Sequence, residues 1–130
     1  MRMIYSELLL DHFEHPRHVG RLPEARDIGT GLAGSRESGG VLRMQIRVNE
    51  DNTLIEVRFQ AYGPPALIAT GSWLAEHMQG LALETAEALT HQPIVRALSL
   101  PSASLHFAML GEDAVRAAIQ DYKDKQKVYA

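Results

Sequence analysis

The spacing of apolar residues changes twice along the chain and divides it into helical and extended stretches. Residues 5–15 place their apolar side chains near one stripe, which predicts a short helix that ends before Pro16. Across 41–61, apolar and polar residues largely alternate, as they do in strands with one buried face. From Pro65 onward the helical spacing returns and continues almost to the C-terminus.

The extended region contains two clear strands and one weak strand. Val41–Val48 and Leu54–Ala61 are predicted to form an antiparallel hairpin, because Glu50-Asp51-Asn52 between them has the composition of a turn. Gly31–Gly34 is a weaker, glycine-rich strand, and the turn at 35–40 joins it to the hairpin. The pattern therefore predicts three antiparallel strands.

Several helices are predicted after the strands. The first covers about 65–80, since proline suits the first helical turn and glycine commonly follows the last. A short helix is predicted at 83–89, and Thr90 is positioned to cap another short helix. We expect Trp73, on the first of these helices, and Tyr62, at the end of the last strand, in or near the core.

The last helix is predicted to begin after Ser102 or Ser104 and to end near Lys127. Together these elements predict an α+β fold of two layers, in which a three-stranded antiparallel sheet packs against several helices. A single domain is expected over residues 1–130. The apolar residues of the last helix that are expected to be buried are Leu105, Met109, Ala114, Ala118, Ile119 and Tyr122.

Composition excludes some classes of function. The chain has 130 residues and a formal net charge of −3, with no basic stripe, so nucleic acid is not an expected partner. No apolar run approaches the roughly 20 residues that a membrane helix needs. The N-terminus lacks the pattern of a secretory signal. We therefore expect a cytoplasmic protein without a membrane contact.

Several short motifs occur in an order that a known family shares. They are Tyr5-Ser6-Glu7, Asp11–Gly20, Phe59–Gly63, Glu112–Ile119 and Asp121-Tyr122-Lys123. As a set they resemble the IscU/NifU N-terminal family of iron–sulfur cluster assembly scaffolds, over about 5–125. The resemblance implies an IscU/NifU-N-like fold and a nascent cluster held by three cysteines.

The chain contains no cysteine, and the resemblance places other residues at the ligand positions. Ser38 stands at the first cysteine position and Gly40 at the aspartate that follows it. Pro64 replaces the second cysteine. His106 matches the family's histidine, and Phe107 replaces the third cysteine. Because iron–sulfur clusters are held chiefly by cysteine thiolates, we predict that this chain binds no cluster and no other cofactor.

Two weak candidates for metal binding remain. At the family site, His106 and Ser38 are the available side chains, with Glu37 nearby, but a neutral hydroxyl is a poor ligand. A second group near the N-terminus consists of His12, His15 and His18. Proline interrupts the helix inside this group, so its geometry stays open.

The replacements also suggest contacts with partners. If the loops keep their family positions, Pro64-Pro65 and Phe107 form a dry apolar plug, which is either a repacked site or a contact for a partner or a second copy. Leu100-Pro101 match the start of the family's chaperone-recognition segment, whereas Ser102-Ala103-Ser104 do not, so chaperone binding is not expected. Asp121-Tyr122-Lys123 matches the end of the last helix that, in the family, helps to dock the cysteine desulfurase.

We expect no enzymatic activity, because Ser38 has no neighbouring base in the sequence and no Gly-x-Ser-x-Gly pattern around it. The main hypothesis is an accessory or regulatory interaction protein of iron–sulfur cluster biogenesis, with the cysteine desulfurase or a true scaffold as its partner. The alternative is a scaffold fold recruited as a binding module for an unrelated protein or a small apolar ligand. Homodimerisation is left open.

Overall fold

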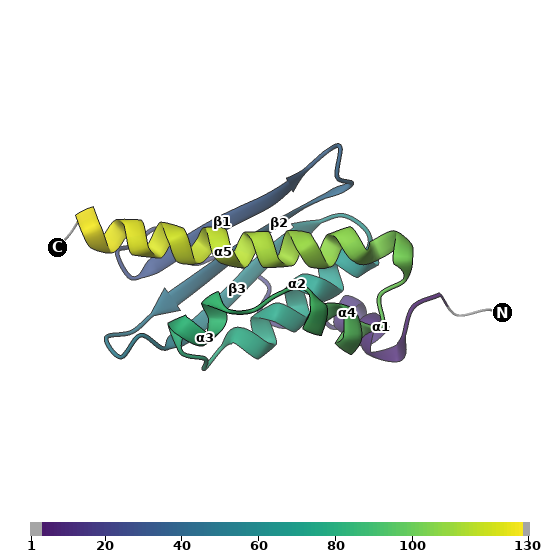
Figure 1. Cartoon of the computed structure of the whole chain (residues 1–130), viewed down its shortest axis with the longest axis horizontal. Helices are drawn as coiled ribbons and strands as arrows, with labels where there is room; N and C mark the ends of the chain where they lie inside the picture. The colour runs from purple at the N-terminus through teal and green to yellow at the C-terminus, as the bar shows by residue number, and fades with distance from the viewer. Residues whose placement is uncertain (1–3, 129–130) are drawn as a thin grey trace.

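The computed structural model describes residues 4–128 and consists of two layers (Figure 1). One layer is an antiparallel sheet with the strand order β1-β2-β3. Its strands are β1 (Ile28–Ser35), β2 (Gly40–Val48) and β3 (Leu54–Tyr62). The other layer contains α1 (Glu7–Glu14), α2 (Pro65–Met78), α3 (Leu83–Glu87), α4 (Gln92–Leu98), the 3-10 turn Ser102–Ser104 and α5 (Leu105–Val128). This architecture confirms the predicted α+β fold.

The core lies between the sheet and two helices. α5 packs mainly on β1 and β2, while α2 packs on β3, and the shorter helices pack against these two. Fully buried side chains come from both layers, including Leu42 and Met44 of β2, Leu74 of α2 and Ile119 of α5. Within the described range 4–128, no helix is long and apolar enough to cross a membrane.

β1 is twice as long as the strand predicted at Gly31–Gly34, because it begins at Ile28. Two of its residues, Gly29 and Gly31, face α5 without a side chain. A Cβ added at Gly31 would meet the backbone carbonyl of Ala114. The helix backbone therefore lies directly on the strand. Hydrophobic periodicity missed this contact because glycine contributes nothing to an apolar pattern.

The start of α4 also differs from the prediction. The helix begins at Gln92 after His91, so the prediction that Thr90 caps it is wrong. Glu112 of α5 instead accepts the backbone N–H of His91 at 2.7 Å. A tertiary contact thus fixes the start of this helix, in place of the local capping that the sequence suggested.

Three apolar residues expected in or near the core lie at the surface. Leu105 and Met109 of α5 expose 40% and 51% of their surface. Each is two positions from buried Phe107, which places it about 200° around the helix from that side chain. Tyr62 is 76% exposed because its side chain points to the outer face of the sheet, whereas Trp73 is buried as predicted.

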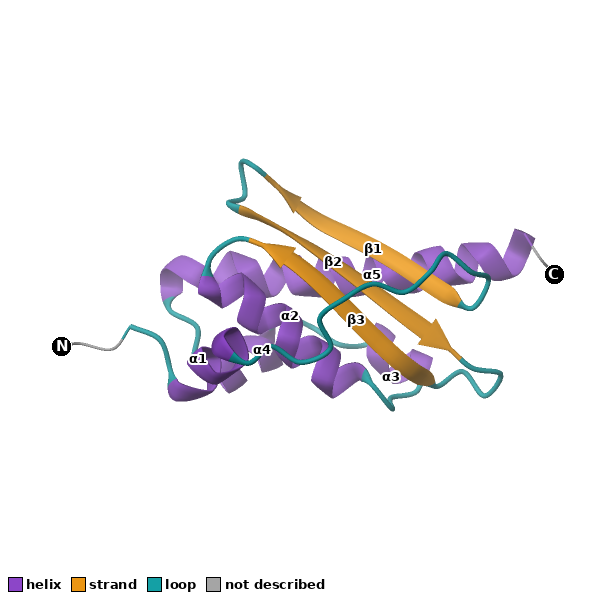
Figure 2. Cartoon of the chain, turned by 180° about the vertical axis from the view of Figure 1, so that it is seen from behind, coloured by secondary structure: helices purple, strands orange, loops and turns teal. Residues whose placement is uncertain are grey.

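The outer face of the sheet is covered over only part of its length. The loop 18–27 crosses it (teal in Figure 2). Phe59 of β3 donates its N–H to the carbonyl of His18 and accepts the N–H of Gly20, both at 3.0 Å. The side chain of Gln45 forms hydrogen bonds with the backbone N–H and carbonyl of Leu22. These bonds anchor the loop over one half of the face.

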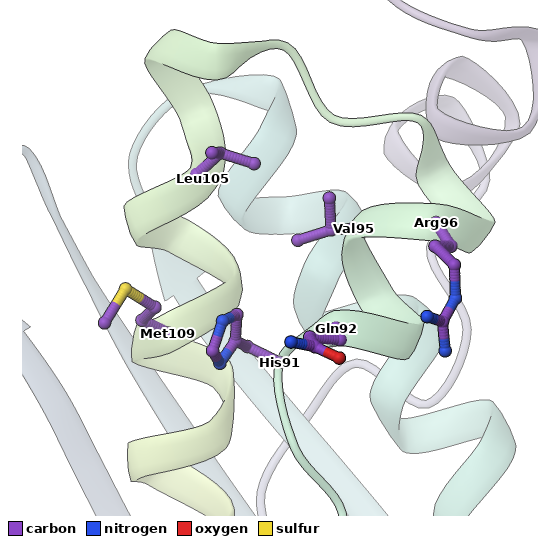
Figure 3. A pocket seen from close by; sticks show the side chains of 6 residues that line it. All are labelled: His91, Gln92, Val95, Arg96, Leu105 and Met109. Carbon is purple, nitrogen blue, oxygen red and sulfur yellow. The ribbon is translucent and has the colours of Figure 1, made fainter.

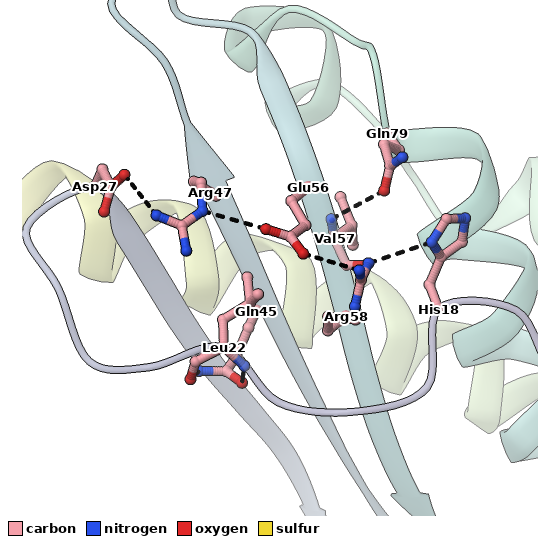
Figure 4. A network of polar contacts seen from close by, with 9 residues as sticks. All are labelled: His18, Leu22, Asp27, Gln45, Arg47, Glu56, Val57, Arg58 and Gln79. Carbon is pink, nitrogen blue, oxygen red and sulfur yellow. Dashed lines mark hydrogen bonds and ion pairs between the residues drawn. The ribbon is translucent and has the colours of Figure 1, made fainter.

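Charged side chains complete this covered half (Figure 4). Arg47 reaches Asp27 at 2.9 Å and Glu56 at 3.2 Å, and Glu56 also accepts from Arg58 at 2.8 Å. The opposite half, next to the turn between β1 and β2, carries no such network within the described chain. Its side chains belong to the site described next.

Candidate functional site

Three segments from distant parts of the sequence meet at one end of the sheet. They are the β1–β2 turn at 35–40, the β3–α2 loop at 62–65, and the start of α5. A Cβ added at Gly63 would lie 3.3 Å from the carbonyl oxygen of Gly39, and one added at Gly39 would lie 3.9 Å from Cζ of Phe107. The structure therefore brings together the ligand-equivalent positions that the resemblance indicated.

Ser38 is occupied within its own turn. Its Oγ accepts the backbone N–H of Ser35 at 2.8 Å and lies within donating distance of the carbonyls of Ser35 (2.9 Å) and Gly40 (3.0 Å). The hydroxyl hydrogen has two backbone acceptors, and an oxygen lone pair is already used. Ser38 thus closes the β1–β2 turn, and this local role competes with any role as a metal ligand.

His106 makes the contact between α5 and this turn. Its Nε2 lies 3.1 Å from the carbonyl oxygen of Ser38. A carbonyl oxygen accepts hydrogen bonds and donates none, so Nε2 carries the hydrogen in this arrangement. The exposed ring then keeps only Nδ1 with a lone pair for a metal ion. One nitrogen is far from the four ligands of a structural zinc site.

Phe107 fills the position of the family's third cysteine. Its side chain is 6% exposed and belongs to the main core cluster. Pro64 and Pro65 are half-buried: Pro65 is the first residue of α2, and Pro64 is its N-cap, whose carbonyl accepts the N–H of Leu67 at 3.0 Å. The site is therefore packed with apolar groups, and so little of Phe107 reaches the surface that it offers a partner almost no contact area.

These residues do not fit an iron–sulfur cluster, because no thiolate is present at the converging positions or elsewhere in the sequence. The carboxyl of Glu37 has a lowered pKa because of a hydrogen bond with its own backbone, followed by one with the Ser35 side chain. It is charged near neutral pH but engaged in the turn. Among residues 4–128, no three or more histidines and carboxylates are grouped to hold a metal ion.

The three N-terminal histidines do not share a site. His12 is 1% exposed, with Nδ1 2.7 Å from the Oγ of Ser72. His15 is exposed, and its Nδ1 lies 3.4 Å from Oδ1 of Asp11, four residues earlier in the chain. The ring of His18 lies 3.4 Å from the guanidinium of Arg58, over the sheet. Each ring has a different environment, and the buried one, His12, has a structural role.

Burial lowers the pKa of His12, and the charge of Arg17 adds to this effect. Asp11 and Glu76 act in the opposite direction, and His77 lowers the pKa slightly. The unfolded chain therefore binds the proton at a higher pH than the folded chain does. We predict that the unfolding free energy falls as the pH drops below about 6.5, by at most about 1.4 kcal/mol per pH unit from this group.

Urea unfolding between about pH 7.5 and about pH 5.5 measures this slope. We expect His12→Gln to flatten it, because glutamine does not titrate, whereas His106→Gln, at an exposed ring, retains the slope of the parent chain. An unchanged slope in His12→Gln would contradict the assignment.

Most of the residues expected to bind partners have partners inside the chain. Leu100 and Tyr122 are 8% and 9% exposed, and Pro101 is half-buried. Asp121 accepts the backbone N–H of Thr30 at 2.8 Å. Lys123 pairs with Glu87 at 2.5 Å. These contacts hold α5 against β1 and α3. The residues near the C-terminal end of α5 therefore stabilise the fold.

Sequence reasoning missed an exposed apolar surface beside the converging loops, which we call the outer-face patch. It consists of Leu32, Val41, Arg43 and Tyr62, on the outer face of the three strands. Leu32 and Tyr62 are 63% and 76% exposed. Nε of Arg43 is buried, yet it has no hydrogen-bond partner in the part of the chain that the structure describes. The signal in the sequence that could have revealed this patch is that each strand carries an apolar residue on its outward-facing side, at Leu32, Val41 and Tyr62.

Comparison with known proteins agrees with this geometry. The family model of the NifU-like N terminal domain matches residues 4–129. The iron–sulfur cluster assembly scaffold protein IscU of Azotobacter vinelandii is 42% identical over 125 residues, which cover 95% of this chain and 98% of that protein. IscU of Escherichia coli is 38% identical over 126 residues, covering 96% and 98% of the two chains.

Solved structures share the fold at low sequence identity. The N-terminal part of a NifU-like protein from Brucella abortus superposes with a TM-score of 0.67 at 16% identity, over 94% of this chain and 96% of that one. The two layers and the three converging segments are thus the fold of a NifU-like N-terminal domain. The chain belongs to the NifU-like N-terminal domain family and is homologous to the IscU scaffold proteins.

Proposed function

We propose that this protein is an accessory interaction protein of iron–sulfur cluster assembly, which binds a partner of the pathway and neither holds a cluster nor catalyses a reaction. The observation that carries the proposal is the state of the family site. The frame is kept, but Ser38 closes a turn, Pro64 is the N-cap residue of α2, and Phe107 belongs to the core. Each of these three residues has a structural role that would be lost if its position were used to bind a cluster.

The degree of similarity supports a role within the same pathway. The chain is 42% identical to a scaffold over 95% of its length, which favours a role related to that of the scaffolds. Folding alone does not demand this identity, because the Brucella abortus domain keeps the fold at 16% identity. Fold and function are separable in general, so the similarity in sequence carries more weight here than the similarity in fold.

The outer-face patch is the surface that we propose for the partner. Its apolar side chains lie together, and exposed apolar groups that form a patch are typical of contact sites. Tyrosine and arginine are the residue types that most often dominate binding energy. A partner that contributes an acceptor to Arg43 would satisfy its buried Nε, which within the described chain lacks one.

This surface adjoins the site, since Tyr62 precedes Gly63 and Val41 follows Gly40. If this protein binds a partner at the surface where that partner receives a scaffold, it would block the true scaffold from the partner while holding no cluster itself. The cysteine desulfurase and the true scaffold are therefore the two partners to test. The chaperone segment keeps only Leu100-Pro101, so we do not propose a chaperone contact.

The test is titration calorimetry of this protein with the cysteine desulfurase and, separately, with the cysteine-containing scaffold of the same organism. We expect binding to at least one of them. Tyr62→Asp should weaken it by at least about tenfold, because a charge would be buried in an apolar contact. The matched control is Leu8→Asp, which changes a 42% exposed apolar residue of α1, away from the outer face of the sheet, and should leave this affinity unchanged.

Absence of binding to both proteins would refute the proposal and favour recruitment of the fold as a binding module outside the pathway. Equal weakening by Tyr62→Asp and Leu8→Asp would refute the assignment of the surface.

A further inference from the structure

A groove of about 290 Å³ lies between α4 and the start of α5, in the helical layer (Figure 3). Its walls come from one side of each helix. Residues four apart in a helix lie on the same side, and both walls follow this spacing. The lining residues are His91, Gln92, Val95, Arg96, Leu105 and Met109.

The floor of the groove is apolar and open to solvent. Leu105 and Met109 occupy adjacent turns of α5 and are 40% and 51% exposed, while Val95 faces them from α4. Further along the same side of α5, the side chains are charged and no longer apolar, at Glu112 and Arg116. The apolar surface is therefore confined to the groove. Methionine and leucine at such a surface adapt readily to the shape of an apolar group.

The rim of the groove is positively charged. Arg96 is exposed and makes no ion pair with any residue in the described part of the chain. Glu112 of α5, which contacts the groove residue His91, is directed inward: Oε1 accepts the N–H of His91 at 2.7 Å, and Oε2 lies 3.4 Å from Arg116. Its side chain is only 16% exposed. The lining of the groove therefore contains an arginine and apolar side chains but no carboxylate.

We propose that this groove binds a peptide segment of a partner protein, in which a large apolar side chain lies beside an aspartate or glutamate. The apolar side chain enters between Val95, Leu105 and Met109, and the carboxylate pairs with Arg96. Grooves between two helices commonly receive peptides in this manner, with a few apolar anchors. Charge complementarity to Arg96 selects acidic over basic segments.

The dimensions of the groove favour a peptide over a free small molecule. Sites for small ligands usually enclose about 300–1,000 Å³ and bury most of the ligand. This groove lies at the lower limit of that range, and its floor residues are about half exposed, so it would leave much of a small ligand in solvent. A peptide needs to bury only one or two side chains here, because the rest of its partner protein supplies further contact area.

The groove is separate from the outer-face patch. It is formed by helices, whereas Leu32 and Tyr62 lie on the outer face of the sheet, which faces away from the helical layer. The two surfaces can therefore be tested independently. A failure of one proposal leaves the other intact.

The experiment is a selection of short displayed peptides on the full chain, with depletion on Met109→Glu. The recovered peptides are then measured by fluorescence polarisation against three variants. We expect sequences with a large apolar residue next to an acidic one. Met109→Glu and Arg96→Glu should each weaken binding by at least about tenfold, and Leu32→Glu, on the outer-face patch, should not. For Arg96→Glu, replacing the peptide's acidic residue with lysine should recover affinity.

Three outcomes would overturn the proposal. The first is that no peptide distinguishes the parent chain from Met109→Glu. The second is that the recovered peptides lack acidic residues or are insensitive to Arg96→Glu. The third is a dimer of the parent chain, seen by sedimentation, that Met109→Glu dissociates, since the groove would then be the contact between two copies.

Discussion

Replacing Ser38, Pro64 and Phe107 together with cysteine is expected to create a zinc site where the parent chain has none. The three positions converge, and His106 at the start of α5 supplies a fourth ligand. Three thiolates and one imidazole form one of the usual ligand sets of structural zinc. Such sites bind with about 10–16 kcal/mol in small peptides, so even a strained version should be readily detected.

The expected result has two parts. Without metal, the triple variant should be less stable than the parent by roughly 3 kcal/mol or more, since removing the ring of Phe107 leaves a cavity in the core. With zinc at about 1,000 times the dissociation constant, binding restores about 4 kcal/mol. Thermal unfolding with and without zinc measures both effects.

Two controls isolate the new ligands. Phe107→Ala makes a similar cavity without a thiolate, so it should be destabilised by roughly 3 kcal/mol, with no response to zinc. The parent chain should show no response to zinc and should remain colourless after anaerobic treatment with iron and sulfide. A zinc response in the parent, or a brown product from it, would show that the existing residues form a metal site after all.

This experiment also separates what the sequence could predict about the site from what it could not. The convergence of Ser38, Pro64 and His106 followed from the resemblance, because a family's fold fixes where its loops meet. The internal hydrogen bonds of Ser38 and the depth of Phe107 did not follow. They depend on how the replacements repack, which is a property of three-dimensional contacts that a linear pattern does not contain.

The same distinction applies to the surfaces. Leu105 and Met109 fit an apolar helical repeat, yet Phe107 and Ala108 take the inward direction at the start of α5, which turns the other two to the surface. Tyr62 looked like a core residue because strand residues alternate and its side of the sheet was unknown. In each case the type of element was predicted correctly, while the direction of the side chain required the packing of the neighbouring layer.

The second large effect is expected at Gly31, where the two layers are in direct contact. A Cβ there would fall 2.9 Å from the carbonyl carbon of Ala117 and still closer to backbone atoms of Ala114 and Ala118. Backbone atoms of a helix cannot rotate away as the end of a side chain can. We therefore predict that Gly31→Ala lowers the unfolding free energy by about 3 kcal/mol or more, at the upper end for overpacked sites.

The effect should be this large because separating α5 from β1 breaks several contacts at once. Asp121 would lose the N–H of Thr30, and Lys125 would lose the carbonyl of Ile28. Against a total stability of about 5–15 kcal/mol for a typical domain, such a loss leaves a marginal or unfolded chain. Chemical denaturation measures it, and a failure to fold is the extreme of the same result.

The neighbouring variant Leu32→Ala is the matched control, because Leu32 points outward from the same strand and is 63% exposed. It should change stability by no more than about 0.5 kcal/mol. A loss below about 1 kcal/mol in Gly31→Ala would mean that α5 is not seated on β1 as the structure places it. The consequence would extend to the site, because β1 positions the turn that holds Ser38, and α5 positions His106 and Phe107.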